Sequence, residues 1–305
     1  MNPNAKILGR LLALSVILSL TLVTASAGRA GEKRFAGIVS SASPEATAAG
    51  VTVLERGGNA IDAAVAVSLA VGVSEPAGSG IAGQTAMLVR QTDGTAFVIN
   101  GTTWSPRRIP DQVTREQLVH GRSATTVPST LRVLDLAWRK YGSGRIEWSQ
   151  LLAPAIEVAE TGFPLGSFRA RAFQRYRSEL ARQPEAAAIF LKADGRPYQE
   201  GEIFRQPLLA ATLRRLADAG AMDFYRGEIA AAIASDMAAN GGWITAADLA
   251  NFPEPAVLPP LKGSYRGNEI LTLPPPFGGW VVLQILNLLE LSPPEHLAHD
   301  DAARR

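Results

Sequence analysis

Hydrophobic and polar residues between positions 37 and 83 follow a pattern that predicts a strand, two helices and a closing loop. Residues 35–41 form a short, mostly apolar run, which is typical of a β-strand. Residues 44–56 follow Ser43, whose side chain can cap a helix, and start with a Pro that suits the first helical position. Residues 60–73 are apolar on every side apart from one early Asp, which predicts a helix buried on every side.

The pattern beyond this region predicts a hairpin followed by a mainly helical chain. Residues 85–90 and 96–100 are expected to be strands joined at a Thr-Asp-Gly turn, and residues 258–273 a second pair of short strands turning at 265–267. Helices are expected at residues 128–141, 148–160, 168–187, 207–219, 225–239, 244–251 and 280–291. The sequence therefore predicts a helix-rich α/β (α+β) fold, with one domain over residues 31–305.

Residues 1–27 have the layout of a secretory signal peptide. Lys6 and Arg10 precede an apolar run at residues 11–23, and small residues follow it, so cleavage is expected after Ala27, with Ala30 as the alternative. A membrane anchor is the competing interpretation, but the run is short for a hydrocarbon core of ~30 Å. We expect an exported protein, periplasmic or secreted, without stable membrane insertion after cleavage.

Charge and cysteine content exclude several classes of function. The formal charge of +2 falls to zero without Lys6 and Arg10, so no nucleic-acid partner is expected. One local basic run is interpreted as a solvated helix face; it consists of Arg169, Arg171, Arg175 and Arg177. The chain contains no cysteine, which excludes disulfides, a thiolate nucleophile and a Cys-based metal site.

Three glycines, Gly78, Gly80 and Gly83, match the G-x-G-x-x-G spacing of dinucleotide sites. That motif requires a preceding strand and a following helix, whereas here a helix is expected before it and a strand after it. We therefore expect these glycines to allow close backbone approach and positive φ angles beside a pocket.

Other candidate chemistry is sparse. His296 and His299 could share a helix face, but their place near residue 305 favours a polar terminus, and no metal site is expected. Residues 100–106, NGTTWSP, follow a predicted strand and are rich in hydroxyls. Such a loop is either a ligand site or an ordinary hydroxyl-stabilised turn.

Five ordered segments of the chain resemble the γ-glutamyltransferase family (γ-glutamyltranspeptidase, glutathione hydrolase). The segment from residue 37 to residue 89 is similar to the family's N-terminal signature. The others are VPST at 127–130, WSQLLAPAIEVAETGFP at 148–164, GGWITAADLANF at 241–252, and the Y-R-G through P-P-P-x-G-G run at 265–279. Together they cover essentially the whole chain after the signal peptide.

The resemblance implies an N-terminal-nucleophile hydrolase fold, a four-layer α/β/β/α sandwich. In this family a precursor cuts itself into two subunits, and the new N-terminal Thr of the small subunit attacks a γ-glutamyl amide such as glutathione. Water or an amino acid then takes the γ-glutamyl group. No metal or organic cofactor is implied.

The chain departs from the family pattern in its length. It ends where the family's large subunit continues, so the processing site, the nucleophilic Thr and the oxyanion-hole glycines are expected outside it. No catalytic residue is assigned within residues 1–305, and the chain alone is expected to be inactive, lacking the small subunit. An acylase with an altered substrate, and a truncated fragment without catalysis, are the alternatives.

The second departure lies in the substrate site. The family's Arg that grips the substrate α-carboxylate stands in an R-E-x-A-P block, and here Thr102 takes the Arg place and Thr103 the Glu place. These two residues are the substrate-binding candidates that the resemblance implies. A hydroxyl cannot form the bidentate charged contact of a guanidinium, so the favoured acyl group is expected to differ.

Overall fold

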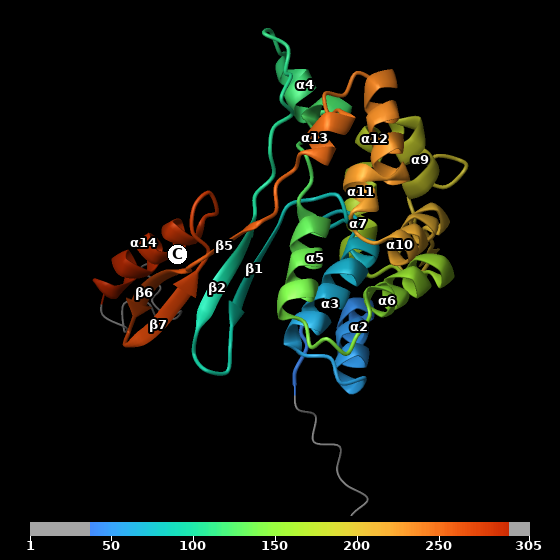
Figure 1. Ribbon diagram of the computed structural model, residues 1–305. Helices are drawn as coiled ribbons and strands as arrows, with labels where there is room; N and C mark the ends of the chain where they lie inside the picture. Colours follow the sequence, from blue (N-terminus) through green and yellow to red (C-terminus); the bar gives the residue numbers. More distant parts are fainter. Residues whose placement is uncertain (1–36, 293–305) are drawn as a thin grey trace, which may run out of the picture. The chain divides into compact units, whose positions relative to one another are not determined.

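The structure is a computed structural model that describes residues 37–292 (Figure 1). The signal peptide, its cleavage site and the pair His296 and His299 lie outside the described residues. The chain divides into two compact units, Met1–Ile38 and Val39–Arg305, and the helices and strands described below belong to the second unit.

A core of helices surrounds the apolar helix α3 (Ala60–Ser74). It packs against α2 (Pro44–Glu55), α5 (Thr130–Tyr141) and α6 (Trp148–Thr161), and α6 also contacts α10 (Pro207–Ala219). The predicted Ser43 cap is confirmed, because its side chain accepts from the Ala46 amide at 3.2 Å. Close packing needs small residues here: a Cβ on Gly50 of α2 would lie 2.6 Å from Val67 of α3.

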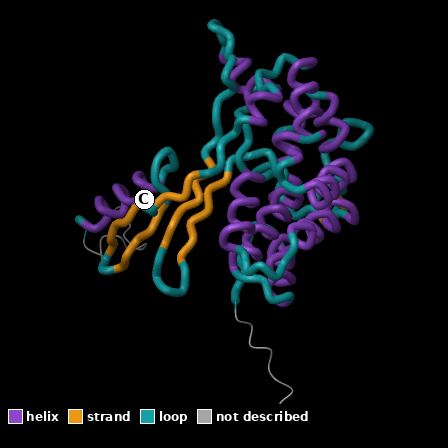
Figure 2. The backbone as a smooth tube through the Cα atoms, viewed as in Figure 1, coloured by secondary structure: helices purple, strands orange, loops and turns teal. Residues whose placement is uncertain are grey.

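The main sheet is a three-stranded antiparallel sheet in the order β1-β2-β5; Figure 2 draws its strands, like all others, in orange. The predicted hairpin is confirmed as β1 (Thr85–Arg90) and β2 (Ala96–Gly101), with Thr85 opposite Gly101. The sequence did not predict β5 (Ala256–Leu258), which pairs with β2. Val98 and Ile99 of β2 are fully buried.

The second predicted hairpin is also confirmed. Strands β6 (Leu261–Tyr265) and β7 (Asn268–Thr272) turn at Arg266 and Gly267, whose φ angles of 51° and 78° suit a two-residue hairpin turn. Helix α14 (Gly279–Glu290) packs on this hairpin and leaves several apolar side chains exposed. They are Trp280, Val281, Val282, Ile285 and Leu288.

Two predicted helices are broken in the structure. Residues 168–187 form α7 (Ser167–Arg175), α8 (Arg177–Ala181) and the start of α9 (Pro184–Phe190). Gln183 is extended because the residue before a Pro is disfavoured in a helical conformation.

Residues 225–239 are interrupted at Gly227, which separates α11 (Asp223–Arg226) from α12 (Glu228–Ala239). A Cβ on Gly227 would lie 1.9 Å from the Asp223 carboxylate, so the chain needs a glycine at this step.

Short elements complete the fold. The pattern did not predict α4 (Arg115–Val119), the 3₁₀ turn η1 (Arg122–Ala124), or the two-residue strands β3 (Phe163–Pro164) and β4 (Ile203–Phe204), which pair with each other. Helix α13 (Ala246–Ala250) agrees with the predicted helix at 244–251 and has the expected Thr245 cap.

The predicted strand at residues 35–41 is wrong for its described part, because residues 37–41 form no ladder with any described strand. Among the helices of residues 37–292, none combines the length and the apolar character needed to span a bilayer.

Candidate functional site

Three segments meet at one buried junction beside the sheet: the start of β1, the end of β2 and the first turn of α5. Ser129 is fully buried; its hydroxyl donates to the Gly101 carbonyl and accepts from the Thr85 amide at 3.3 Å. The amides of Ser129 and Thr130 donate to the Gly83 carbonyl at 2.9 and 3.2 Å. Thr85 and Thr130 share a hydroxyl hydrogen bond of 2.9 Å. Ser129 therefore fixes the end of β2 where the candidate loop begins.

The two substrate-binding candidates, Thr102 and Thr103, begin directly after this junction. Both are half-buried, and the Thr102 amide donates to Asn100 Oδ1 at 3.1 Å. Within residues 37–292, the hydroxyls of Thr102 and Thr103 form no hydrogen bond. The loop is held further on by the Val127 amide, which donates to the Trp104 carbonyl at 2.8 Å. It therefore presents free hydroxyls on a fixed backbone.

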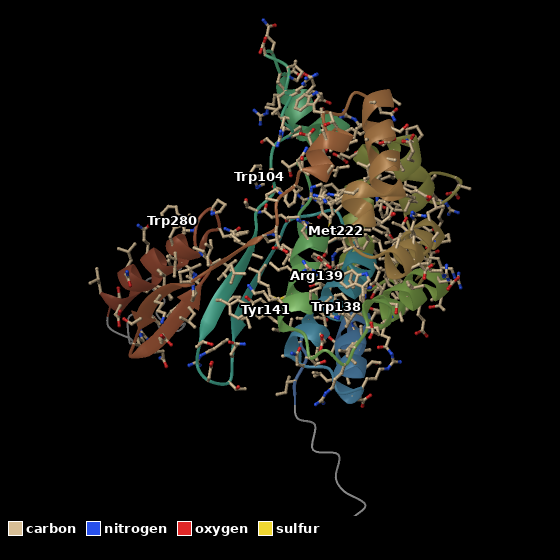
Figure 3. All side chains as sticks on the ribbon, viewed as in Figure 1. Trp104, Trp138, Arg139, Tyr141, Met222 and Trp280 are labelled. Carbon is tan, nitrogen blue, oxygen red and sulfur yellow. The ribbon has the colours of Figure 1, made fainter. Side chains whose placement is uncertain are left out.

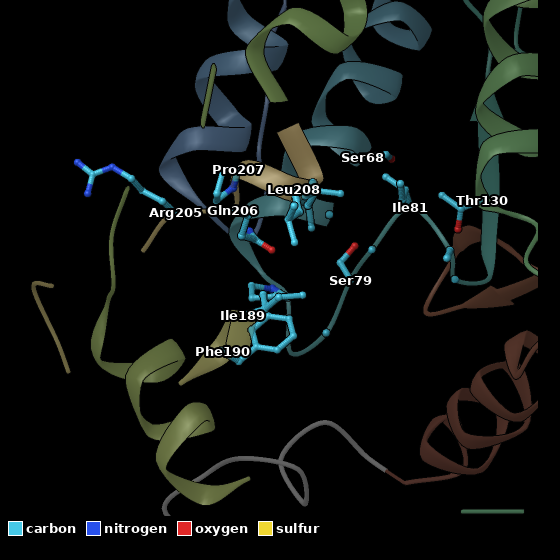
Figure 4. Close-up of a pocket in the computed structure, with 18 of the residues that line it drawn as sticks. Ser68, Ser79, Ile81, Thr130, Ile189, Phe190, Arg205, Gln206, Pro207 and Leu208 are labelled. Carbon is cyan, nitrogen blue, oxygen red and sulfur yellow. The ribbon is translucent and has the colours of Figure 1, made fainter. Parts of the chain in front are cut away.

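A cavity of about 990 Å³ opens beside the junction (Figure 4). Its wall is the small-residue loop at 76–85 together with one face of α3, the end of α9 and the start of α10. Ser79, Gln206 and Thr130 supply polar groups, and Phe190 supplies apolar surface, while Arg205 points away from the other labelled residues in Figure 4. Thr102 and Thr103 do not line it, although Thr85, the strand partner of Gly101, does.

The three glycines of the 76–85 loop line this cavity, as the sequence predicted. The expected positive φ angles are wrong for Gly78, Gly80 and Gly83, none of which has a positive φ. Close approach occurs instead at Gly72 of α3, where a Cβ would lie 3.3 Å from the Gly80 backbone. Helix α3 precedes this loop and β1 follows it, which is the reverse of a dinucleotide site.

Arg169 corrects the prediction that its basic run is a solvated helix face. Its side chain is buried at the base of the 76–85 loop, 3.5 Å from a Glu45 carboxylate oxygen and 3.4 Å from one of Glu75. It also donates to the Ser74 carbonyl at 3.2 Å and lies over the Phe163 ring. The pKa of Glu75 is raised, mainly because burial disfavours the charged carboxylate. The positive charge of Arg169 acts to lower this pKa, and the negative charge of Glu45 acts to raise it further. The other three arginines of the run are exposed, as predicted.

The C-terminal end of α3 is held by two further buried contacts. Gln206 Nε2 donates to the Val73 carbonyl at 2.7 Å, and the hydroxyls of Ser43 and Ser74 lie 2.7 Å apart. These contacts fix the point from which the cavity wall leaves α3.

An aromatic column lies behind the Trp104 loop, and sequence reasoning did not find it. The Phe252 ring stacks on Tyr225 with centroids 5.8 Å apart, and the Trp104 ring meets Phe252 edge-on at 6.4 Å. Tyr225 is buried, which raises its pKa, and its hydroxyl donates to the Pro128 carbonyl at 3.0 Å. Phe252 is the last residue of the GGWITAADLANF segment, so this motif is the sequence feature from which the aromatic contact could have been anticipated.

A carboxylate ties the same segment to the loop. Asp248 accepts from the Arg107 amide at 3.0 Å and from the Thr245 hydroxyl and amide. Burial alone would raise the pKa of Asp248, but these hydrogen bonds outweigh it and the net pKa is lowered. Within residues 37–292, no three His, Asp or Glu side chains are grouped closely enough to hold a metal.

Comparison with known proteins identifies the relatives of the chain. The gamma-glutamyltranspeptidase family profile matches residues 46–304. The glutathione hydrolase proenzyme of Escherichia coli is 35% identical over 83% of the chain and 45% of the relative, and the acylase ACY 1 proenzyme of Pseudomonas sp. (strain SE83) is 36% identical over 83% and 48%. The chain thus spans less than half the length of these curated relatives.

Solved structures agree with the sequence comparison. Helicobacter pylori gamma-glutamyltranspeptidase superposes with a TM-score of 0.81 at 32% identity, over 90% of this chain and 80% of that one. Cephalosporin acylase from Bacillus halodurans gives a TM-score of 0.73 at 28% identity, over 86% and 52%. The predicted N-terminal-nucleophile hydrolase fold is confirmed for this portion, and the chain belongs to the gamma-glutamyltranspeptidase family.

Proposed function

We propose that residues 31–305 form the large-subunit part of an exported enzyme that cleaves amides through an N-terminal Thr located outside this chain. The leading reaction is transfer of a γ-glutamyl group from a substrate such as glutathione to water or an amino acid. Relatives named glutathione hydrolase proenzyme support this reaction. No cofactor is part of the proposal.

The observation that carries the proposal is the Thr102–Thr103 loop, whose backbone is held at the Ser129 junction; Thr85 and Thr130 of that junction line the cavity, and Thr102 and Thr103 do not. A loop with a fixed backbone and free hydroxyls is suited to position a ligand, since little ordering is needed on binding. The family resemblance supports this role, because Thr102 occupies the position of the Arg that binds the substrate carboxylate in the family pattern.

An acylase with a different acyl group is the second candidate, and the same loop favours it. Replacing a charge-assisted contact by a neutral hydroxyl removes about 1.5–3 kcal/mol of binding to a carboxylate. Thr102 therefore weakens recognition of a γ-glutamyl α-carboxylate. The likeness to acylase ACY 1 and cephalosporin acylase supports this candidate.

The small subunit is the proposed partner. Strand β1 pairs with β2 along one edge, and no described strand pairs with its other edge. Helix α14 exposes Trp280, Ile285 and Leu288 by about half or more. An unpaired strand edge and an exposed apolar helix face are surfaces that proteins usually cover.

The test compares the 305-residue chain with a longer protein that carries the family's small subunit. We expect no saturable γ-glutamyl-p-nitroanilide turnover by the chain alone and amide hydrolysis by the longer protein. In the longer protein, Thr102→Arg is expected to lower KM for the γ-glutamyl substrate by about tenfold or more.

The matched control, Thr95→Arg, adds the same charge at the opposite end of β2 and is expected to leave KM unchanged. An unchanged KM in Thr102→Arg contradicts the proposed role of Thr102. Saturable turnover by the chain alone contradicts the proposed location of the nucleophile. Recovery of the protein from the periplasm or medium, shortened after Ala27 or Ala30, tests the export proposal.

A further inference from the structure

We propose that Trp104 is a specificity-determining residue whose ring binds an aromatic acyl group of the amide substrate. The inference rests on the proposed function, because it places the acyl end of the substrate at the loop that follows β2. Figure 3 labels Trp104 beyond the end of β2.

The first observation is that Trp104 is exposed although its backbone is fixed. Its side chain is 53% exposed, while its carbonyl accepts from the Val127 amide at 2.8 Å. Two residues further, Pro106 is buried, and the Arg107 amide is bonded to Asp248 at 3.0 Å. An exposed indole on a tethered backbone binds an aromatic group with little loss of conformational freedom.

The second observation is the aromatic column behind the indole. Phe252 is 6% exposed and Tyr225 1% exposed, so both rings support Trp104 from within the protein. Beneath them the Arg132 guanidinium lies 5.7 Å from the Tyr225 ring centre and donates to the Phe252 carbonyl at 3.4 Å. The column leaves the outer part of the indole free and prevents it from turning inward.

The third observation is the chemistry of the neighbouring side chains. Thr103 and Thr102 place neutral hydroxyls one and two residues before Trp104, while Arg107, Arg108 and the apolar Ile109 are exposed further along the loop. The hydroxyls next to the ring offer no charged partner to the α-ammonium and α-carboxylate of a γ-glutamyl group, so the immediate surroundings of the indole favour an uncharged planar acyl group. Ring-on-ring contacts prefer offset or edge-to-face geometry, which an aromatic group can adopt here and an aliphatic chain cannot.

The probes are phenylacetamide and L-glutamine, the latter being the simplest γ-glutamyl amide, titrated into the 305-residue chain at low concentration. Binding is followed by isothermal titration calorimetry, which does not depend on the indole of Trp104 as a reporter. We expect a saturable change with phenylacetamide that glutamine does not produce. Trp104→Ala is expected to weaken phenylacetamide binding by about tenfold, and Trp104→Phe by less, since it retains an aromatic ring.

Trp280→Ala is the matched control, because Trp280 of α14 is 48% exposed and lies outside the loop. It is expected to leave phenylacetamide binding unchanged, and circular dichroism shows that each variant remains folded. Equal affinity in Trp104→Ala, equal or tighter binding of glutamine, or no binding of either probe overturns the inference.

The outcomes also separate this inference from the proposed function. Amide hydrolysis by the longer protein with phenylacetamide binding independent of Trp104 retains the function and refutes the inference. Binding of phenylacetamide through Trp104 without amide hydrolysis by the longer protein retains the site and refutes the function.

Discussion

Replacing Ser129 by Ala tests whether one hydroxyl holds the candidate loop in place. Ser129 is fully buried, and its hydroxyl serves two backbone groups, the Gly101 carbonyl and the Thr85 amide. The Ala side chain offers neither a donor nor an acceptor, so both groups lose this buried partner. Leaving a buried polar group unsatisfied costs about 1–3 kcal/mol, and two partly compensated groups predict a loss of about 2–3 kcal/mol in the free energy of unfolding.

Urea unfolding measures the loss in Ser129→Ala, and hydrogen exchange locates it. The Thr85 amide, which donates to the Ser129 hydroxyl, is expected to exchange faster than in the unaltered chain. Ser178→Ala is the matched control, because the Ser178 hydroxyl donates to Glu179 at an exposed position, and its effect is expected to stay within about 0.5 kcal/mol. A Ser129→Ala chain as stable as this control, with unchanged exchange at Thr85, refutes the reasoning.

Two further substitutions test other parts of the fold. The Asp223 carboxylate is bonded to Arg215 at 2.7 and 2.8 Å and accepts from two amides at the start of α12, which lowers its pKa from 3.8 to about 2. Because the folded pKa lies below the unfolded one, the resulting stability is present above pH 4 and is lost as the pH falls toward 2. Asp223→Asn should remove about 1–2 kcal/mol of this pH-dependent stability, a figure that allows for the solvent exposure of Arg215. Urea unfolding between pH 2 and 7 measures the loss. An unchanged pH profile contradicts the assignment of this stability to Asp223. Leu288→Glu on the exposed face of α14 should reduce self-association of the isolated chain by about tenfold in sedimentation experiments. The control variant Leu118→Glu, on the exposed surface of α4, should leave self-association unchanged. Equal effects of the two variants exclude a specific role for α14.

Local signals in the sequence predicted most elements correctly. Ser43 and Thr245 cap the helices that they were expected to cap, and the turn at 265–267 forms the expected hairpin. These features depend on residues within one or two turns of each other, so the pattern contains the necessary information. The break before Pro184 was present in the sequence as well, through the effect of a Pro on the residue before it.

Features made by distant residues could not be predicted in this way. The burial of Arg169 depends on Glu45 and Glu75, which lie on other helices or at their ends. Strand β5 is short and follows a Pro-rich segment, and its identity as a strand depends on its pairing with β2. The sequence identifies Thr102 and Thr103 as substrate candidates by their residue types. It does not predict that the backbone of their loop is held by Ser129 and Val127, which are remote in sequence.

The anchoring of the 76–85 loop has a consequence for the order of events during synthesis. Glu75, at the start of the loop, is bound by Arg169, and the neighbouring Val73 carbonyl is bound by Gln206. At ordinary translation rates, the ribosome needs on the order of ten seconds to proceed from the loop to Gln206. The wall of the cavity is therefore synthesised early and anchored late. The nascent chain must keep these small and apolar residues from misassociating until Gln206, at the start of its last third, has emerged.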